Sequence, residues 1–170
     1  MNTVLLIARL YFGLGLAAHG VQKLFGWYGG GGLKGTGEFM VKLGFPSGRF
    51  FATAAALGEA AGGLLVALGL FGPIPPALMI VVMITAVLTV HVRNGFFASK
   101  NGVEVPLLYA MGAFALAFTG PGAFSLDRIF GLLWLSSERL AWLAVALAVA
   151  VALANYAVSR APARPPLTAK

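Results

Sequence analysis

Charged and polar side chains interrupt the first long apolar run of the chain, and these residues are the most able to carry chemistry. The stretch Arg9–Lys23, RLYFGLGLAAHGVQK, holds two cations, His19 and Gln22. A charge in the middle of a bilayer costs about 2.5–3.5 kcal/mol on insertion scales, so such groups face a bundle interior, pair or line a site. On a helix, Arg9, His19 and Lys23 fall within one arc of roughly 80°. The sequence therefore predicts one polar helix face that is turned toward other parts of the protein.

Glu59 stands near the middle of the second apolar run and is the costliest residue to bury in lipid. One interpretation joins Arg9 and Glu59 in a structural ion pair between the first two membrane spans. The other has Glu59 carry protons or bind a polar head group. The residue types alone leave both interpretations open.

Two histidines are the remaining candidates for acid–base chemistry. Alternation of the spans puts His19, Lys23 and His91 near one end of the bundle, where Asn94 and Glu104 follow in the next loop. In one interpretation each histidine forms a hydrogen bond to a backbone carbonyl. In the other it exchanges a proton with a quinone carbonyl or forms a hydrogen bond to it, which suits imidazole because this group titrates near neutrality. Lys23 either binds a ligand or extends its amine to the interface. No close ligand spacing such as HxxxH is present, and we predict no metal or haem site.

The composition is that of a membrane protein. Hydrophobic residues make up 59% of the 170 and charged residues only 10%, whereas soluble domains have about 25% charged residues. The mean hydropathy is +0.90. The net charge of +7 resides in loops and the tail, where topology and anionic lipid explain it better than nucleic acid does. The absence of cysteine excludes thiol chemistry, disulfides and cysteine-ligated iron–sulfur clusters in this chain.

The predicted fold is an all-α integral membrane protein, a four-helix transmembrane bundle with an interfacial helix and a fifth transmembrane helix. The expected spans cover residues 4–24, 50–70, 77–92, 106–119 and 140–158. The predicted domains are a four-span bundle at 1–120, an interfacial amphipathic segment at 121–138, a fifth transmembrane helix at 139–158 and a basic, Pro-rich, disordered tail at 159–170.

Several local signals refine this prediction. Gly13, Ala17 and Gly20 share a face of the first span and let a neighbouring helix approach closely. Ser125 is a candidate N-cap, and Asp127 suits the first turn of an amphipathic helix that continues to Leu135. Five spans place nine Lys and Arg residues on one side and three on the other. The positive-inside rule then puts the N-terminus outside the cytoplasm.

The chain resembles the DoxX family of bacterial and archaeal membrane proteins over about residues 8–127. The matching pieces are ARLYFGLGLAAHGVQKLFGWYGG, the E-x-x-G-G at 59–63, HVRNGFFASKNGVEVPLL and TGPGAFSLD. The resemblance implies a four-helix membrane bundle in redox-related systems, since founding members are linked to quinone-reducing oxidoreductases of archaeal sulfur metabolism and actinobacterial relatives to oxidative-stress complexes. The polar positions that it carries over are Arg9, His19, Gln22, Lys23, Glu59, His91, Asn94, Glu104 and Asp127. The fifth span and the basic tail exceed the common family pattern.

The first functional hypothesis is a quinone-interacting or membrane-anchor subunit of a redox complex. His19 and His91 would bind the head group, Glu59 would assist proton movement and Arg9 would hold Glu59. The further binding residues of this hypothesis are Arg9, Gln22, Lys23, Asn94 and Glu104. No covalently bound cofactor is expected, and electrons would come from a protein partner.

Two other classes stay open. The chain could be a non-enzymatic scaffold or assembly protein that recruits a soluble redox partner, with the same polar residues holding the bundle together. Buried charges also mark transport pathways, so the third hypothesis is a transporter of small molecules or lipids. In each case we expect a multi-pass protein of a bacterial or archaeal plasma membrane that contacts the lipid bilayer and no nucleic acid. Whether it forms a homo-oligomer is left open.

Overall fold

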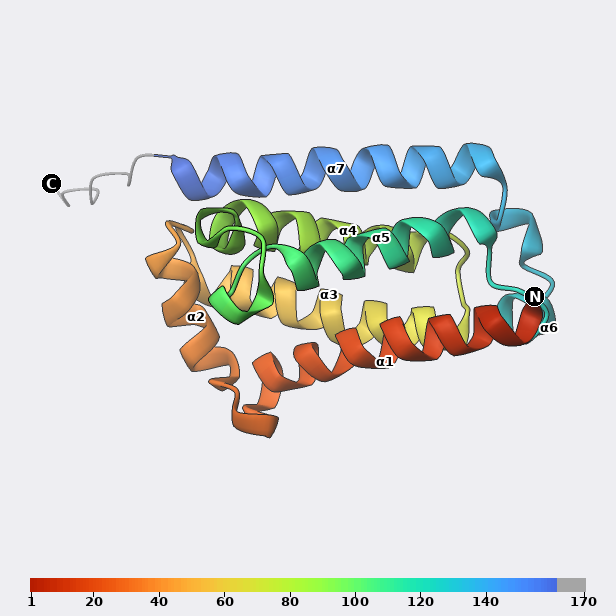
Figure 1. The fold of residues 1–170 in the computed structure, drawn as a ribbon, viewed down its shortest axis with the longest axis horizontal. Helices are drawn as coiled ribbons and strands as arrows, with labels where there is room; N and C mark the ends of the chain where they lie inside the picture. Colours follow the sequence, from red (N-terminus) through yellow and green to blue (C-terminus); the bar gives the residue numbers. More distant parts are fainter. Residues whose placement is uncertain (162–170) are drawn as a thin grey trace, which may run out of the picture.

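Five long helices run up and down along the longest axis of the molecule, as seen in Figure 1 of the computed structural model, which describes residues 1–161. The long helices of this part of the chain are α1 (Asn2–Phe25), α3 (Gly48–Leu68), α4 (Ile74–Ala86), α5 (Glu104–Thr119) and α7 (Glu138–Arg160). At its end α4 continues into a π-helical segment, η2 (Val87–His91), and a 3-10 turn, η3 (Val92–Asn94). The 161 described residues contain no β-strand, so the predicted all-α fold is confirmed.

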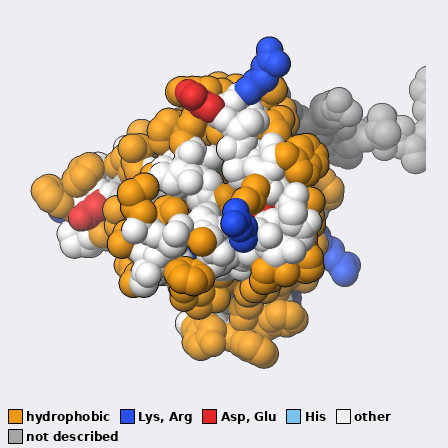
Figure 2. All heavy atoms as spheres, turned by 90° about the vertical axis from the view of Figure 1, so that its right-hand side faces the viewer, with side chains coloured by type: hydrophobic (Ala, Val, Ile, Leu, Met, Phe, Trp, Pro, Cys, Tyr) orange, Lys and Arg blue, Asp and Glu red, His pale blue; other side chains and the backbone are white. Residues whose placement is uncertain are grey.

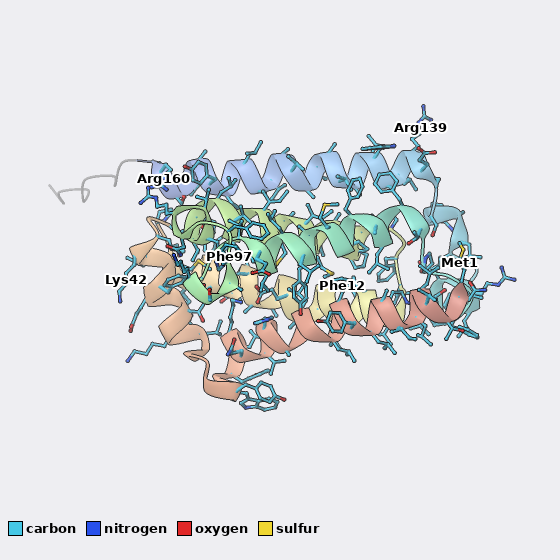
Figure 3. All side chains as sticks on the ribbon, in the orientation of Figure 1. Met1, Phe12, Lys42, Phe97, Arg139 and Arg160 are labelled. Carbon is cyan, nitrogen blue, oxygen red and sulfur yellow. The ribbon has the colours of Figure 1, made fainter. Side chains whose placement is uncertain are left out.

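Short elements close the two ends of the bundle. At one end lie η1 (Trp27–Gly29), α2 (Gly32–Lys42) and η4 (Ala98–Lys100); at the other lie the N-terminus, α6 (Leu126–Ile129) and η5 (Leu133–Leu135). Figure 3 shows Lys42, Phe97 and Arg160 at the first end and Met1 and Arg139 at the second. We call the first of these the α2 end and the second the α6 end.

The bundle has the length and the apolar surface of a membrane domain. Four segments are long and apolar enough to cross a bilayer: Asn2–Phe25, Gly48–Leu68, Ile74–Asn94 and Glu138–Arg160. The fourth predicted span, α5, is a shorter apolar helix of 16 residues. Viewed from the α6 end, hydrophobic side chains form most of the perimeter and charged side chains are few (Figure 2). The predicted membrane bundle is therefore confirmed.

Helices α1 and α3 pack so closely that small residues are required between them. A Cβ atom added at Gly13 would lie 2.6 Å from the carbonyl oxygen of Gly63, and one added at Gly20 would overlap the backbone of Ala60. These contacts confirm the predicted close approach along the face of Gly13, Ala17 and Gly20. They also set the antiparallel register, because Gly13 lies between Gly63 and Ala67, while Gly20 lies between Ala56 and Ala60.

The predicted Arg9–Glu59 ion pair is wrong, and this register gives the reason. Arg9 lies beside Gly69, which is ten residues, or roughly 15 Å of helix, away from Glu59. Arg9 is 3% exposed and its guanidinium donates hydrogen bonds to the carbonyl oxygens of Pro121 and Phe124. The arginine therefore ties the start of α1 to the chain segment that follows α5.

Asp127 is also more than a residue that favours a helix N-terminus. It is fully buried, and its carboxylate accepts hydrogen bonds from the backbone N–H groups of Phe71 (2.8 Å) and Gly72 (2.7 Å) in the turn between α3 and α4. Ser125 caps α6 as predicted, by accepting from the N–H of Arg128 at 3.2 Å. The amphipathic helix predicted to reach Leu135 is wrong in length, because α6 ends after four residues. Tertiary hydrogen bonds to Asp127 hold this segment.

The last helix and the first loop also differ from the predicted bounds. Helix α7 begins at Glu138 and runs to Arg160, so it includes the first residues assigned to the basic tail. The rest of that tail, from residue 162 on, lies outside the described residues. Helix α2 spans eleven residues between the first two predicted spans and begins at Gly32, inside the glycine run. It lies across the α2 end of the bundle (Figure 1).

Candidate functional site

A pocket of about 330 Å³ opens at the α2 end, between the helices and the loop that joins α4 to α5. Its walls combine polar side chains from four helices and the loop with apolar surface. The polar lining residues are His19, Lys23, Glu59, His91, Asn101 and Tyr109. Leu16, Met83 and Pro106 are among the apolar ones. The pocket thus gathers chemistry-bearing residues that are up to 90 positions apart in the chain.

An ion pair crosses the interface between α1 and α3 at this pocket. Lys23 Nζ lies 2.5 Å from Glu59 Oε2. Glu59 is 3% exposed, whereas the Lys23 side chain is 28% exposed. The α1–α3 register brings Glu59 beside the last turn of α1, so Lys23 takes the place that we predicted for Arg9. A buried carboxylate needs such a partner, because an unpaired charge in an apolar interior is strongly unfavourable.

His91 is held by the backbone of the loop that follows it. Its Nδ1 lies 2.8 Å from the carbonyl oxygen of Asn101. The amide nitrogen of Asn94 donates to the same oxygen at 3.1 Å. Asn101 has a left-handed backbone (φ 58°), a conformation that asparagine tolerates well. The two donors and the turn therefore fix both the carbonyl and the imidazole ring.

The π-helical segment decides which side chain of this helix reaches the pocket. Met83 and Ala86 line the pocket, and regular α-helical spacing would place Val90 next on that face. The π turn of η2 takes one extra residue, and His91 lines the pocket instead. Single π turns of this kind occur frequently at functional sites.

His19 and Tyr109 form the wall between α1 and α5. Their rings meet edge to face with centroids 6.3 Å apart. The Tyr109 hydroxyl lies against Gly15, where a Cβ atom would overlap it, and its ring also meets Phe12 with centroids 5.7 Å apart. Within residues 1–161, neither the His19 ring nor the Tyr109 hydroxyl makes a hydrogen bond to another protein group. Both are therefore available to a ligand.

The remaining predicted site residues lie outside the pocket lining. Gln22 donates from Nε2 to the carbonyl of Tyr28 at 3.2 Å and so holds the turn after α1. Glu104 Oε2 accepts from the N–H of Ala98 at 2.8 Å, which closes the loop over the pocket. Asn94 acts through the Asn101 carbonyl, and Arg9 lies at the α6 end. Gln22, Asn94 and Glu104 thus hold the turns and the loop near the pocket, whereas Arg9 lies at the other end of the bundle.

Comparison with known proteins places this chain in a family. The family model described as DoxX matches residues 4–92, which is more than half of the chain. The chain belongs to the DoxX family. An uncharacterized membrane protein of Mycobacterium tuberculosis, Rv3486, is 29% identical over 130 residues, which cover 71% of this chain and 77% of that protein. No solved structure matches the chain.

The DoxX match contains part of the pocket but not all of it. His19, Lys23, Glu59 and His91 lie within the matched residues. The Asn101 carbonyl and Tyr109 lie beyond the matched residues.

Among the residues that the structure describes, no group of three or more His, Asp or Glu side chains is placed to hold a metal ion.

Two members of this pocket were not predicted from the sequence. Tyr109 carries a hydroxyl into an otherwise apolar span, three residues after Pro106, and that polar group inside a span was the available signal. Asn101 contributes a backbone carbonyl, which no side-chain motif reveals. The Lys23–Glu59 pair also had no local signal, because 36 residues separate its partners.

Proposed function

We propose that this DoxX-family protein binds a quinone head group in the pocket at the α2 end and serves as a membrane subunit of a redox complex. One observation carries the proposal. Two imidazoles, a phenol and a buried carboxylate–ammonium pair surround a single pocket between apolar helices. Ionisable residues inside a membrane bundle mark a functional site by default.

The donor set of the pocket fits a flat ring that carries oxygens on opposite edges. Lys23 keeps further N–H donors besides the one directed at Glu59, because an ammonium group has three. The Tyr109 hydroxyl and the His19 ring add groups that can donate or accept. Leu16, Met83 and Pro106 supply apolar surface for the ring faces. A pocket of about 330 Å³ lies within the size range of small-molecule sites, roughly 300–1,000 Å³.

The proposal assigns separate roles to the polar side chains. A quinone takes up protons when it is reduced, and its reduced form releases them when it is oxidised. His19, His91 and Glu59 are the groups that can hold such protons at the pocket. Lys23 would bind a ligand oxygen and keep Glu59 paired. Electrons reach the site from a partner protein in this scheme.

The loop over the pocket favours a second candidate, a membrane anchor that recruits a soluble redox protein. Phe96 and Phe97 are 56% and 65% exposed on this loop, next to the exposed cations Arg93 and Lys100. Aromatic residues and arginine are enriched in protein–protein interfaces. Under this candidate the pocket residues have only a packing role, and capture of the partner would survive the loss of both histidines.

Mass spectrometry of quinones extracted from gently purified protein tests the first candidate. We expect a stoichiometric quinone in the wild-type protein and its loss in the His19→Ala/His91→Ala variant. Arg139→Ala, at the opposite end of the bundle, is the matched control and should retain the quinone. If neither wild type nor control holds quinone after incubation with excess quinone, the proposal is overturned and the anchor becomes the better candidate.

A further inference from the structure

We infer that the pocket prefers the reduced, hydroxyl-bearing form of its ligand, a quinol, over the oxidised quinone. The inference rests on the proposed function and concerns the same site. The quinol hydroxyl would donate a hydrogen bond to Nε2 of His91.

The protonation pattern of His91 follows from its contact with the loop. The Asn101 carbonyl oxygen, 2.8 Å from Nδ1, can only accept a hydrogen bond. Nδ1 must therefore carry the proton, and a neutral imidazole then has none on Nε2. Nε2 is the ring nitrogen left for a ligand in the pocket, and it presents a lone pair. A hydroxyl can donate to that lone pair, whereas a quinone carbonyl oxygen cannot.

The loop is built to keep the ring in this state. Asn94 donates to the same Asn101 oxygen at 3.1 Å and holds it in position. Two backbone hydrogen bonds close the loop beneath it, from Val103 N–H to the Gly95 oxygen at 3.0 Å and from Glu104 N–H to the Phe96 oxygen at 2.9 Å. If the proton moved to Nε2, the Nδ1 lone pair would face the carbonyl oxygen. The closed loop therefore favours the tautomer that accepts from the ligand.

Glu59 gives the pocket a second acceptor. Its Oε2 is paired with Lys23, and within the described part of the chain Oε1 has no hydrogen-bond donor. Glu59 lines the pocket although the residue as a whole is 3% exposed. A carboxylate oxygen accepts hydrogen bonds, which a hydroxyl group can donate and a carbonyl group cannot. Both forms of the ligand can accept from the Lys23 donors, but only the form with hydroxyl groups can also donate to these two acceptors, which favours the quinol.

Binding of three matched probes to the full-length purified protein tests the inference. The probes are a decyl-substituted benzoquinol, its oxidised quinone and its di-O-methyl ether, compared without oxygen by calorimetric titration. We expect the quinol to bind about 10-fold more tightly than either other probe, the size of one hydrogen bond of roughly 1.4 kcal/mol. His91→Phe, which removes one of the two acceptors, should reduce the difference between quinol and ether.

The possible results separate this inference from the proposed function. Equal or tighter binding of the quinone to the wild-type protein overturns the inference and leaves the quinone site standing. Failure of all three probes to bind overturns both. An unchanged quinol preference in folded His91→Phe protein would show that His91 is not one of the acceptors. Because the main comparison uses wild-type protein, a folding defect in the variant does not affect it.

Discussion

Lys23 Nζ lies 2.5 Å from Glu59 Oε2, and this contact joins the last turn of α1 to the middle of α3. The pair sits where glycines and alanines bring the two helices close together, and it also forms one wall of the pocket. The same two charges therefore serve the packing of the helices and, in the proposed function, the binding of the ligand.

Removal of one partner of the pair should destabilise the bundle. We expect Lys23→Ala to lower the free energy of unfolding by about 3–5 kcal/mol, because it leaves the Glu59 carboxylate buried and unpaired. Denaturant unfolding in detergent micelles measures the change. The double variant Lys23→Met/Glu59→Leu should recover most of the loss. Lys34→Ala, an exposed change on α2, is the control and should stay within about 0.5 kcal/mol of wild type.

Arg9 should contribute to folding and not to ligand binding. Arg9→Ala removes two hydrogen bonds to the Pro121 and Phe124 carbonyls, each worth about 1.5–3 kcal/mol for a charged donor. The yield of folded protein should fall, while the folded fraction keeps the quinone affinity of the wild type, since the pocket lies at the other end. Size-exclusion chromatography followed by titration measures both. A selective loss of affinity with normal yield would contradict this separation.

The close packing of α1 and α3 makes a specific prediction at Gly20. A Cβ atom there would overlap the backbone of Ala60 and Ala56, which cannot move aside as a flexible side chain can. We expect Gly20→Ala to destabilise the protein by about 1–3 kcal/mol, the usual range for overpacking. Gly35→Ala on α2 is the matched control, because nothing lies within 4 Å of the added atom. Thermal unfolding of the two variants should differ clearly, and equal melting temperatures would refute the interface.

The π turn before His91 can be tested without changing composition. Exchanging neighbours, as Val90→His with His91→Val, moves the imidazole to the position that does not line the pocket. Folding should be retained, while quinone affinity falls about as far as in His91→Ala. Calorimetric titration compares the exchanged, His91→Ala and wild-type proteins. Wild-type affinity in the exchanged protein would mean that the π turn does not select His91.

Local patterns in the sequence predicted much of the fold and part of the site. The apolar runs predicted the helices because a membrane span must satisfy its own backbone hydrogen bonds. Alternation of those spans predicted that His19 and His91 lie near one end, and both line the pocket there. The short helix at 126–129 was harder to predict, since tertiary contacts to Asp127 and not helix periodicity hold that segment.

The sequence alone determined that this chain is a multi-span helical membrane protein of the DoxX family, because hydropathy and family motifs are properties of local sequence. Only the tertiary structure decided which charges meet. Glu59 pairs with Lys23 and not with Arg9 because glycine contacts set the α1–α3 register. In this register Arg9 lies beside Gly69, ten residues or roughly 15 Å of helix away from Glu59. The π turn that directs His91 to the pocket was likewise seen only in the structure.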